Sequence, residues 1–258
     1  LRISSAMTKK TIKRIIAEET DYIRVCLRWV PHVLSTSNLS QRVQLCRELL
    51  LQIKLFAKTN FINVITLDET WVFMKNYQPS MFIKKVEKQP ERPRKTIGDE
   101  KRMFKVCFSE EGIQFVHFLP KGTTMDSKVF TSEVIKPLQQ KYIKEYYAQR
   151  GEYYLHFDNA PINKSQYTQT YINAGIFSVL KHPPYSSDFS PCEYYLFGQL
   201  KQELKGIMMN SEEQMKTEVG KILNEIHPIE IQRALRSWSR RLEQIIQHNG
   251  AYYNKDKW

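Results

Sequence analysis

The segment from about residue 60 to 206 alternates strand-like runs with helical patterns, and this alternation limits the possible folds more than any other feature. Strand-like runs are rich in β-branched and aromatic residues, or alternate apolar with polar positions. Such runs are residues 61–67, 103–108, 113–118, 153–157 and 176–180. The second and third flank Glu111-Gly112, which indicates a hairpin. Helical spacing of apolar residues predicts helices at about 126–143, 164–173 and 192–205, so we expect an α/β fold.

A short basic helix is expected near the start of the chain. Ile12, Ile15 and Ile16 fall on one helical face after a Ser/Thr-rich beginning. The cations of this segment are Lys9, Lys10, Lys13 and Arg14. It fits the recognition helix of a helix-turn-helix. An ordinary basic surface helix is the alternative, and these residues taken alone favour it.

Further helices are expected on either side of the alternating segment. Residues 38–41 have the pattern of a capping box, followed by helical spacing to Ala57. The charges in this helix, Arg42 among them, suit a solvated outer face. Two C-terminal helices are expected from a cap at Ser211.

The composition indicates a basic protein with a sizeable core. The 258 residues carry a formal net charge of +12, and 41% of them are hydrophobic. A charge of this size favours a polyanionic partner, most often nucleic acid, and a basic protein without such a partner is the alternative. The chain starts at Leu1 without a signal-peptide pattern, and we expect further sequence upstream. No apolar run is long enough to span a membrane.

The cysteines suggest a reducing compartment. The four cysteines form no Cys-x-x-Cys pair, so neither a zinc knuckle nor a disulfide framework is expected. Reduced thiols fit a nuclear or cytosolic protein.

Two aspartates follow strand-like runs and are candidates for a shared site. Asp68 ends the run 64–67, and Asp158 ends the run 154–157. Ligands and catalytic groups gather at the carboxyl ends of strands in α/β sheets. If the two strands are neighbours, both carboxylates project into one crevice. An aspartate after a strand is more often a turn former or a helix cap, and that alternative stays open here.

A third acid is needed for a site that holds hard cations. Mg²⁺ prefers oxygen ligands, and two such ions about 4 Å apart hold the attacking and leaving oxygens in phosphodiester displacement. Glu193 is a candidate, because residues 159–192, 34 in number, allow the chain to return to the same crevice. Asp188 and Glu69 are competitors that the charge pattern does not exclude.

Four sequence blocks, taken in order, resemble mariner-type transposases. They are WVPH at 29–32, LDETW at 67–71, HFDNAP at 156–161 and HPPYSSDFSPCEYYLF at 182–197. Each block alone is weak, and all four with family-like spacing make a specific match that runs to the C-terminus.

The resemblance implies a ribonuclease-H-like catalytic domain, with a mixed sheet flanked by helices, that uses three acids and two Mg²⁺ or Mn²⁺ ions. The family's acids fall on Asp68, Asp158 and Glu193. Such enzymes cut transposon ends by hydrolysis and join the freed 3′ hydroxyls to target DNA, typically at TA. Most mariner members have Asp at the third position, so Glu193 is a departure that we expect to be tolerated.

The resemblance also implies the domain organisation. Residues 1–37 correspond to a remnant of a second helix-turn-helix plus a linker. Residues 38–258 correspond to the catalytic domain, with a basic insertion near 76–100 and C-terminal helices.

Partners and location follow from the same resemblance. The linker and the insertion, which carries Arg92, Arg94 and Lys95, match segments that contact a second protomer, so a homodimer is expected; a solvated loop is the alternative for the insertion. Transposon inverted repeats and target DNA are the expected partners, in the nucleus. His182 and Tyr185 are further candidates for DNA contact.

Two other functions remain possible at this stage. A domesticated or decayed derivative would bind DNA or a protein without catalysis, and the missing upstream part favours it, whereas the presence of all three acids argues against it. Another ribonuclease-H-like nuclease or integrase is the other alternative, and the linker and Pro-Pro-Tyr blocks argue against it.

Overall fold

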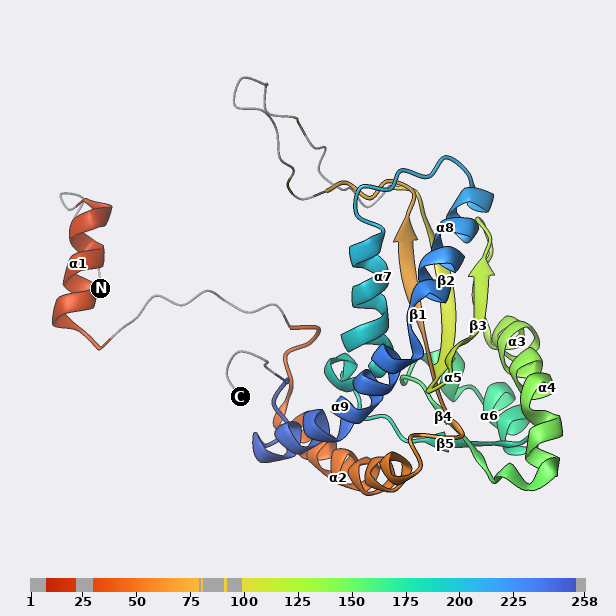
Figure 1. Cartoon of the computed structure of the whole chain (residues 1–258). Helices are drawn as coiled ribbons and strands as arrows, with labels where there is room; N and C mark the ends of the chain where they lie inside the picture. The colour runs from red at the N-terminus through yellow and green to blue at the C-terminus, as the bar shows by residue number, and fades with distance from the viewer. Residues whose placement is uncertain (1–7, 22–29, 79, 81–90, 92–98, 254–258) are drawn as a thin grey trace. The chain divides into compact units, whose positions relative to one another are not determined.

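The computed structural model describes residues 8–21, 30–78, 80, 91 and 99–253 (Figure 1). The chain divides into two units, residues 1–33 and 34–258, and each is described by itself. The first unit contains helix α1, Lys9–Glu19, and the Thr8 side chain accepts a hydrogen bond from the Thr11 N–H at its start. The expected short helix is therefore confirmed, and its interpretation as part of a helix-turn-helix stays a prediction.

The second unit is built on a five-stranded mixed sheet in the order β3-β2-β1-β4-β5. Strand β1 pairs antiparallel with β2 and parallel with β4, so it is the centre of the sheet. The strands are β1 Val64–Phe73, β2 Lys101–Ser109, β3 Gly112–Leu119, β4 Tyr153–His156 and β5 Phe177–Leu180. The α/β fold with a mixed sheet flanked by helices is confirmed, as is the hairpin at Glu111-Gly112.

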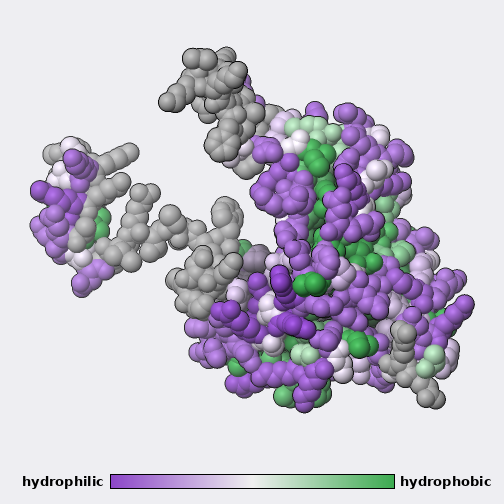
Figure 2. Space-filling model, in the orientation of Figure 1, coloured by the Kyte–Doolittle hydropathy of each residue, from purple (hydrophilic) through white to green (hydrophobic). Residues whose placement is uncertain are grey.

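Helices cover both faces of the sheet, and each face has its own apolar core (Figure 1). One core joins the sheet to α2 (Thr36–Lys58), η4 (Cys192–Leu196), α7 (Phe197–Glu203), α8 (Glu212–Glu225) and α9 (Pro228–Gln247). The other joins it to α3 (Ser127–Phe130), η1 (Thr131–Ile135), α4 (Lys136–Glu145) and α6 (Gln166–Asn173). The remaining helical segments are η2 (Tyr146–Arg150), α5 (Pro161–Lys164) and η3 (Ser187–Phe189). On the face shown in Figure 2, hydrophilic residues dominate the surface.

Two boundaries differ from the sequence prediction. Strand β1 begins at Val64 and not at Phe61, because Asn60, Phe61 and Asn63 have positive φ and form a turn after α2. The strand also runs past Asp68 to Phe73, so Asp68 lies within β1 and does not end it.

The cap of α2 was also predicted wrongly. Helix α2 starts at Thr36, and its capping box pairs the Ser35 side chain with Asn38, three residues upstream of the predicted cap. Arg42 in this helix is fully buried, so its predicted place on a solvated face is wrong. The predicted cap at Ser211 is confirmed. The sequence offers Asp126 or Ser127 as the cap of the helix that follows, and the structure has Asp126 in this role.

Some predicted segments lie wholly or mostly outside the described residues. These are the basic insertion near 76–100, including Arg92, Arg94 and Lys95, and Trp29 of the linker. Among the described residues, no helix combines the length and apolar character needed to cross a membrane.

Candidate active site

Asp68 and Asp158 lie at the same edge of the parallel half of the sheet. The parallel pairing of β1 with β4 ends at Thr66 and His156. Beyond this point β1 continues beside β2, and Asp68 faces Val106 across the strands. Asp158 comes two residues after the last residue of β4. The expectation that the two strands are neighbours is therefore correct, although only one of the two aspartates follows its strand.

Glu193 reaches this edge from a widened helical turn. It is the second residue of η4, a π-helix in which the Phe197 N–H donates to the Cys192 carbonyl. Single π turns inside helices occur frequently at functional sites. The Glu193 N–H donates to the Ser190 carbonyl at 2.9 Å, which fixes the start of the turn after the preceding loop.

The three carboxylates lie close enough to affect one another electrostatically. Burial raises the pKa of Asp68 well above its ordinary value, and the charges of Glu69, Asp158 and Glu193 raise it further. Partial desolvation raises the pKa of Glu193; Lys201 opposes this, and Asp158 and Glu69 add to it. Glu193 is exposed to solvent, so burial alone does not account for this shift, and the charge of the neighbouring Asp158 contributes to it.

The hydrogen bonds of these acids leave oxygen atoms available for an ion. Asp68 Oδ1 accepts from the Glu69 N–H at 2.8 Å. Asp158 Oδ1 accepts from the Ala160 N–H at 3.0 Å and from Asn163 Nδ2 at 2.9 Å. Within the described part of the chain, the second oxygen of each aspartate and the Glu193 carboxylate have no hydrogen-bond donor.

This donor set fits a hard divalent cation. It consists of carboxylate oxygens, the ligands that Mg²⁺ and Mn²⁺ take, and their mutual repulsion is relieved by bound positive charge. Among the described residues, however, no group of three or more His, Cys, Asp and Glu side chains is arranged closely enough to hold a metal ion. To hold one ion together, the three carboxylates would therefore have to move closer to one another than they are in this structure.

The two competing acids are held by buried cations. Glu69 points to the opposite face of the sheet from Asp68, because side chains alternate along a strand. There its Oε2 lies 2.8 Å from Nζ of Lys105, which is fully buried and stacks over the Phe130 ring. Asp188 forms a two-point ion pair with the buried Arg42. These contacts favour Glu193 over both competitors as the third acid.

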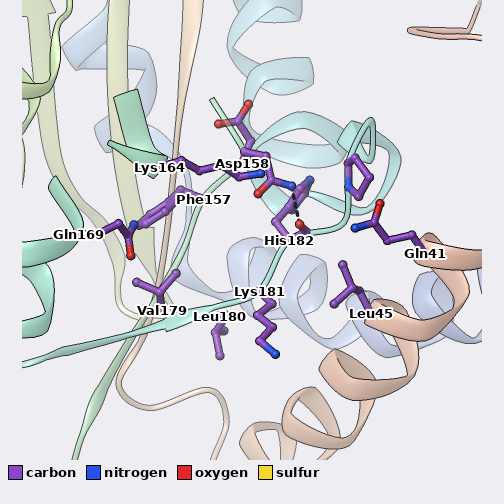
Figure 3. Close-up of a pocket in the computed structure, with 12 residues that line it drawn as sticks. Gln41, Leu45, Phe157, Asp158, Lys164, Gln169, Val179, Leu180, Lys181 and His182 are labelled. Atoms are coloured by element: carbon purple, nitrogen blue, oxygen red, sulfur yellow. Dashed lines mark hydrogen bonds between the residues drawn. The ribbon is translucent and has the colours of Figure 1, made fainter. Parts of the chain in front are cut away.

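A pocket of about 610 Å³ opens beside Asp158 (Figure 3). Strand β5 contributes Val179 and Leu180 to its lining, and α2 contributes Gln41 and Leu45. Its polar lining includes Asn159, Gln169, His182 and two lysines, Lys164 and Lys181. Ammonium groups beside a carboxylate site suit a substrate that carries phosphates.

The predicted DNA-contacting residues are distributed over several places. His182 lines the pocket, but the residue is only 7% exposed, and its Nδ1 lies 3.0 Å from Nε2 of the buried His156. Burial lowers the pKa of His182 to about 3 and that of His156 well below its usual range, so both rings are neutral. Tyr185 is half exposed, with φ of 53°.

The remaining predicted residues of the described structure belong to the first unit. Lys10 and Arg14 are exposed on α1 in the separate first unit, which also contains Lys9 and Lys13. The predicted DNA contacts of all these residues stay predictions.

Sequence reasoning missed three buried polar residues around the acids: Arg42, Thr66 and Lys105. Arg42 and Lys105 look like ordinary surface cations in the sequence, because their partners are far along the chain. Thr66 lies within an apolar run and gave no signal apart from its position two residues before Asp68.

Comparison with known proteins identifies relatives of this chain. Residues 63–216 match the family model described as DDE superfamily endonuclease. The chain is 26% identical over 193 residues to the Mariner Mos1 transposase of Drosophila mauritiana, covering 73% of this chain and 55% of that protein. It is 25% identical over 236 residues to the histone-lysine N-methyltransferase SETMAR of Homo sapiens, covering 88% of this chain and 33% of that protein. The chain thus spans about a third and about half of the lengths of these curated relatives.

Solved structures of Mos1 share the fold. The Mos1 mariner paired-end complex with Mn superposes with a TM-score of 0.80 at 20% identity, covering 96% of this chain and 72% of that chain. The catalytic domain of Mos1 superposes with a TM-score of 0.70 at 21% identity, covering 88% of this chain and all of that domain. The sheet and its flanking helices are therefore ribonuclease-H-like, as in that domain.

Proposed function

The chain belongs to the DDE superfamily of endonucleases, as a mariner/Tc1-type transposase catalytic domain, and we propose that it cuts DNA at transposon ends and joins those ends to target DNA. The observation that carries this proposal is the position of Asp68, Asp158 and Glu193 at one edge of the sheet, where their charges act on one another. We propose TA as the target sequence and the nucleus as the location.

The three acids would hold two Mg²⁺ or Mn²⁺ ions. Asp68 lies on the central strand and is the most buried of the three. The charges of both other acids raise its pKa, so Asp68 is the acid that would be placed to contact both ions. Asp158 and Glu193 would then hold one ion each. When bound, such ions activate a water or a 3′ hydroxyl for attack on phosphorus and stabilise the leaving oxygen.

Other residues of the chain bind and orient the substrate. Lys164 and Lys181 in the pocket beside Asp158 are placed to contact phosphates of the DNA backbone, a contact that does not read sequence. The net charge of +12 adds a general attraction for DNA. Mos1 forms a paired-end complex with transposon DNA, and we propose that two copies of this chain likewise bring two ends together.

The test is cleavage of pre-nicked transposon-end DNA by the purified chain with Mn²⁺. Asp68→Asn, Asp158→Asn and Glu193→Gln are each expected to abolish cleavage, because each removes a charged oxygen ligand. DNA binding, measured by mobility shift, is expected to persist in all three. Full cleavage by any of these variants refutes the assignment.

A second candidate function is DNA binding without catalysis. It is favoured by the absence, among the described residues, of acids already grouped closely enough to hold an ion. Under this alternative the wild-type chain shifts DNA in the gel and cleaves none of it at any Mn²⁺ concentration.

A further inference from the structure

A chain of hydrogen-bonded polar side chains lies in the core behind the three acids. Cys192 Sγ is 3.5 Å from Thr66 Oγ1, and Thr66 Oγ1 is 3.3 Å from His156 Nδ1. The opposite ring atom, His156 Nε2, is 3.0 Å from Nδ1 of His182. Thr66, His156 and Cys192 are fully buried, and His182 nearly so. Four polar groups deep in an apolar core are costly unless each has a partner, and here each has one.

The members of this chain come from the elements that carry the acids. Thr66 and His156 are opposite each other at the end of the parallel pairing of β1 and β4. Side chains two apart on a strand share a face, so Thr66 lies on the same face of β1 as Asp68. Three members precede the three acids by one or two positions: Thr66 before Asp68, His156 before Asp158 and Cys192 before Glu193.

The hydrogen bonds fix the orientation of both imidazoles. A neutral imidazole has one N–H donor and one acceptor nitrogen, so the chain can run in only two directions. In one, Cys192 donates to Thr66, Thr66 to His156 and His156 to His182; in the other, every donor and acceptor is exchanged. Either direction requires a single tautomer at each ring.

Aromatic rings pack around the two imidazoles. The ring centroids of His156 and Trp238 are 4.6 Å apart, and those of His182 and Phe189 are 4.9 Å apart. The His182 backbone is also held, since Asn159 Nδ2 donates to its carbonyl at 2.5 Å. Because Asn159 directly follows Asp158, this hydrogen bond connects the loop after β5 to the segment that carries Asp158.

We propose that Thr66 and His156 are positioning residues that set the relative placement of β1, β4 and η4, and through them the geometry in which the three carboxylates hold divalent ions. This inference rests on the proposed function. Removing a group that orients metal ligands without touching the metal typically lowers metal affinity or activity by about 10–100-fold.

The sequence offers a matched pair of variants on either side of Asp68. Thr66 and Thr70 are both buried in β1, two residues before and two residues after Asp68. Thr70 Oγ1 has no hydrogen-bond partner in the described structure, whereas Thr66 Oγ1 has two. Thr66→Val and Thr70→Val therefore make the same change of shape and polarity, and only the first breaks the chain.

The experiment measures Mn²⁺ binding by electron paramagnetic resonance, without DNA and without turnover. Thr66→Val is expected to weaken Mn²⁺ binding by roughly tenfold or more. Thr70→Val is expected to bind Mn²⁺ as the wild type does, and Thr66→Ser, which keeps the hydroxyl, is expected to restore binding. Equal affinities of Thr66→Val and Thr70→Val overturn the inference.

Two further measurements separate the possible failures. Asp68→Asn serves as reference: if it binds Mn²⁺ as tightly as the wild type, the proposed function fails and this inference fails with it. If Asp68→Asn loses Mn²⁺ but Thr66→Val does not, only the inference fails. Nitrogen-15 spectra of the wild-type imidazoles do not depend on any variant folding, and a single fixed tautomer at His156 and at His182 is expected. Averaging between tautomers at His156 overturns the proposal.

Discussion

The guanidinium of Arg42 and the carboxylate of Asp188 form a two-point ion pair, with Nη1–Oδ1 at 3.1 Å and Nη2–Oδ2 at 2.9 Å. The same guanidinium donates to the carbonyls of Tyr185 and Gly250. Helix α2, the loop that leads to Glu193 and the segment after α9 thus meet at one fully buried side chain. Arg42 and Gly250 lie outside residues 63–216 that match the family model, so elements beyond that match support the loop.

Removing this cation is expected to destabilise the fold strongly. Arg42→Met leaves the nearly buried Asp188 carboxylate uncompensated, a change that costs about 3–5 kcal/mol when a buried pair is broken. Lys54→Met is the matched control, because Lys54 on the same helix pairs with Glu243 at the surface, where the expected loss is below about 1 kcal/mol. Urea unfolding measures both. Similar losses in the two variants would contradict the role given to Arg42.

Glu69→Gln is expected to retain cleavage. The Glu69 carboxylate is held by Lys105 on the face of β1 opposite Asp68, so it is not a ligand of the ions. Its removal also takes away a negative charge that raises the pKa of Asp68. The assay is cleavage at saturating Mn²⁺, with Asp68→Asn as the inactive comparison. Because Glu69→Gln also removes the carboxylate partner of the buried Lys105, urea unfolding must show that the variant stays folded. Complete loss of cleavage in the folded variant would mean that the two acids exchange roles.

Glu193→Asp is expected to lower the cleavage rate by about tenfold to a hundredfold, since a displacement of about 1 Å at a reacting centre costs up to that much. The shorter side chain starts from the same η4 backbone and stops one methylene short of the position that Glu reaches. Single-turnover cleavage rates for the wild type, Glu193→Asp and Glu193→Gln test this order. An Asp variant as fast as the wild type would show that the backbone adjusts freely.

Stability is expected to depend on pH through Glu110, far along the chain from the acids. Burial raises the pKa of Glu110 from 4.5 to about 7. The folded state therefore binds this proton more tightly than the unfolded state, so its contribution to stability is present below pH 4.5 and is lost as pH rises through about 7.

Glu110→Gln is expected to flatten this pH dependence and to be most favourable, relative to the wild type, above pH 7. Urea unfolding at a series of pH values measures the slope. Glu111→Gln, at the exposed neighbouring position in the same turn, is the control and is expected to keep most of the slope, because burial raises the pKa of Glu110 more than the Glu111 charge does. Identical slopes in the wild type and Glu110→Gln would contradict the assignment.

Local patterns predicted the five strands and the main helices, because buried faces leave a regular apolar spacing or a β-branched run in the sequence, and turns and caps leave their own residues. They failed at Phe61 and Asn63, where a left-handed turn is made by residues that look like the start of a strand. They also failed to show that β1 continues beyond Asp68, since the antiparallel pairing that extends β1 depends on β2, which comes about thirty residues later.

The site could be predicted only in part for a similar reason. Charge pattern could not choose among Glu193, Asp188 and Glu69, and the resemblance to a family made the choice. Two contacts distinguish the competing acids Asp188 and Glu69 from Glu193. They join Arg42 to Asp188, 146 positions apart in the sequence, and Lys105 to Glu69, 36 positions apart. When a cation pairs with an acid that far away in the sequence, no local sequence pattern reveals the pair.

The widened turn of η4 sets the direction in which the Glu193 side chain leaves the helix. Phe197 and Leu200 anchor α7 in the core, while the extra residue of the π turn swings Glu193 by about 100° relative to regular winding. The reach of the third acid is therefore governed by two separable variables, side-chain length and helical winding.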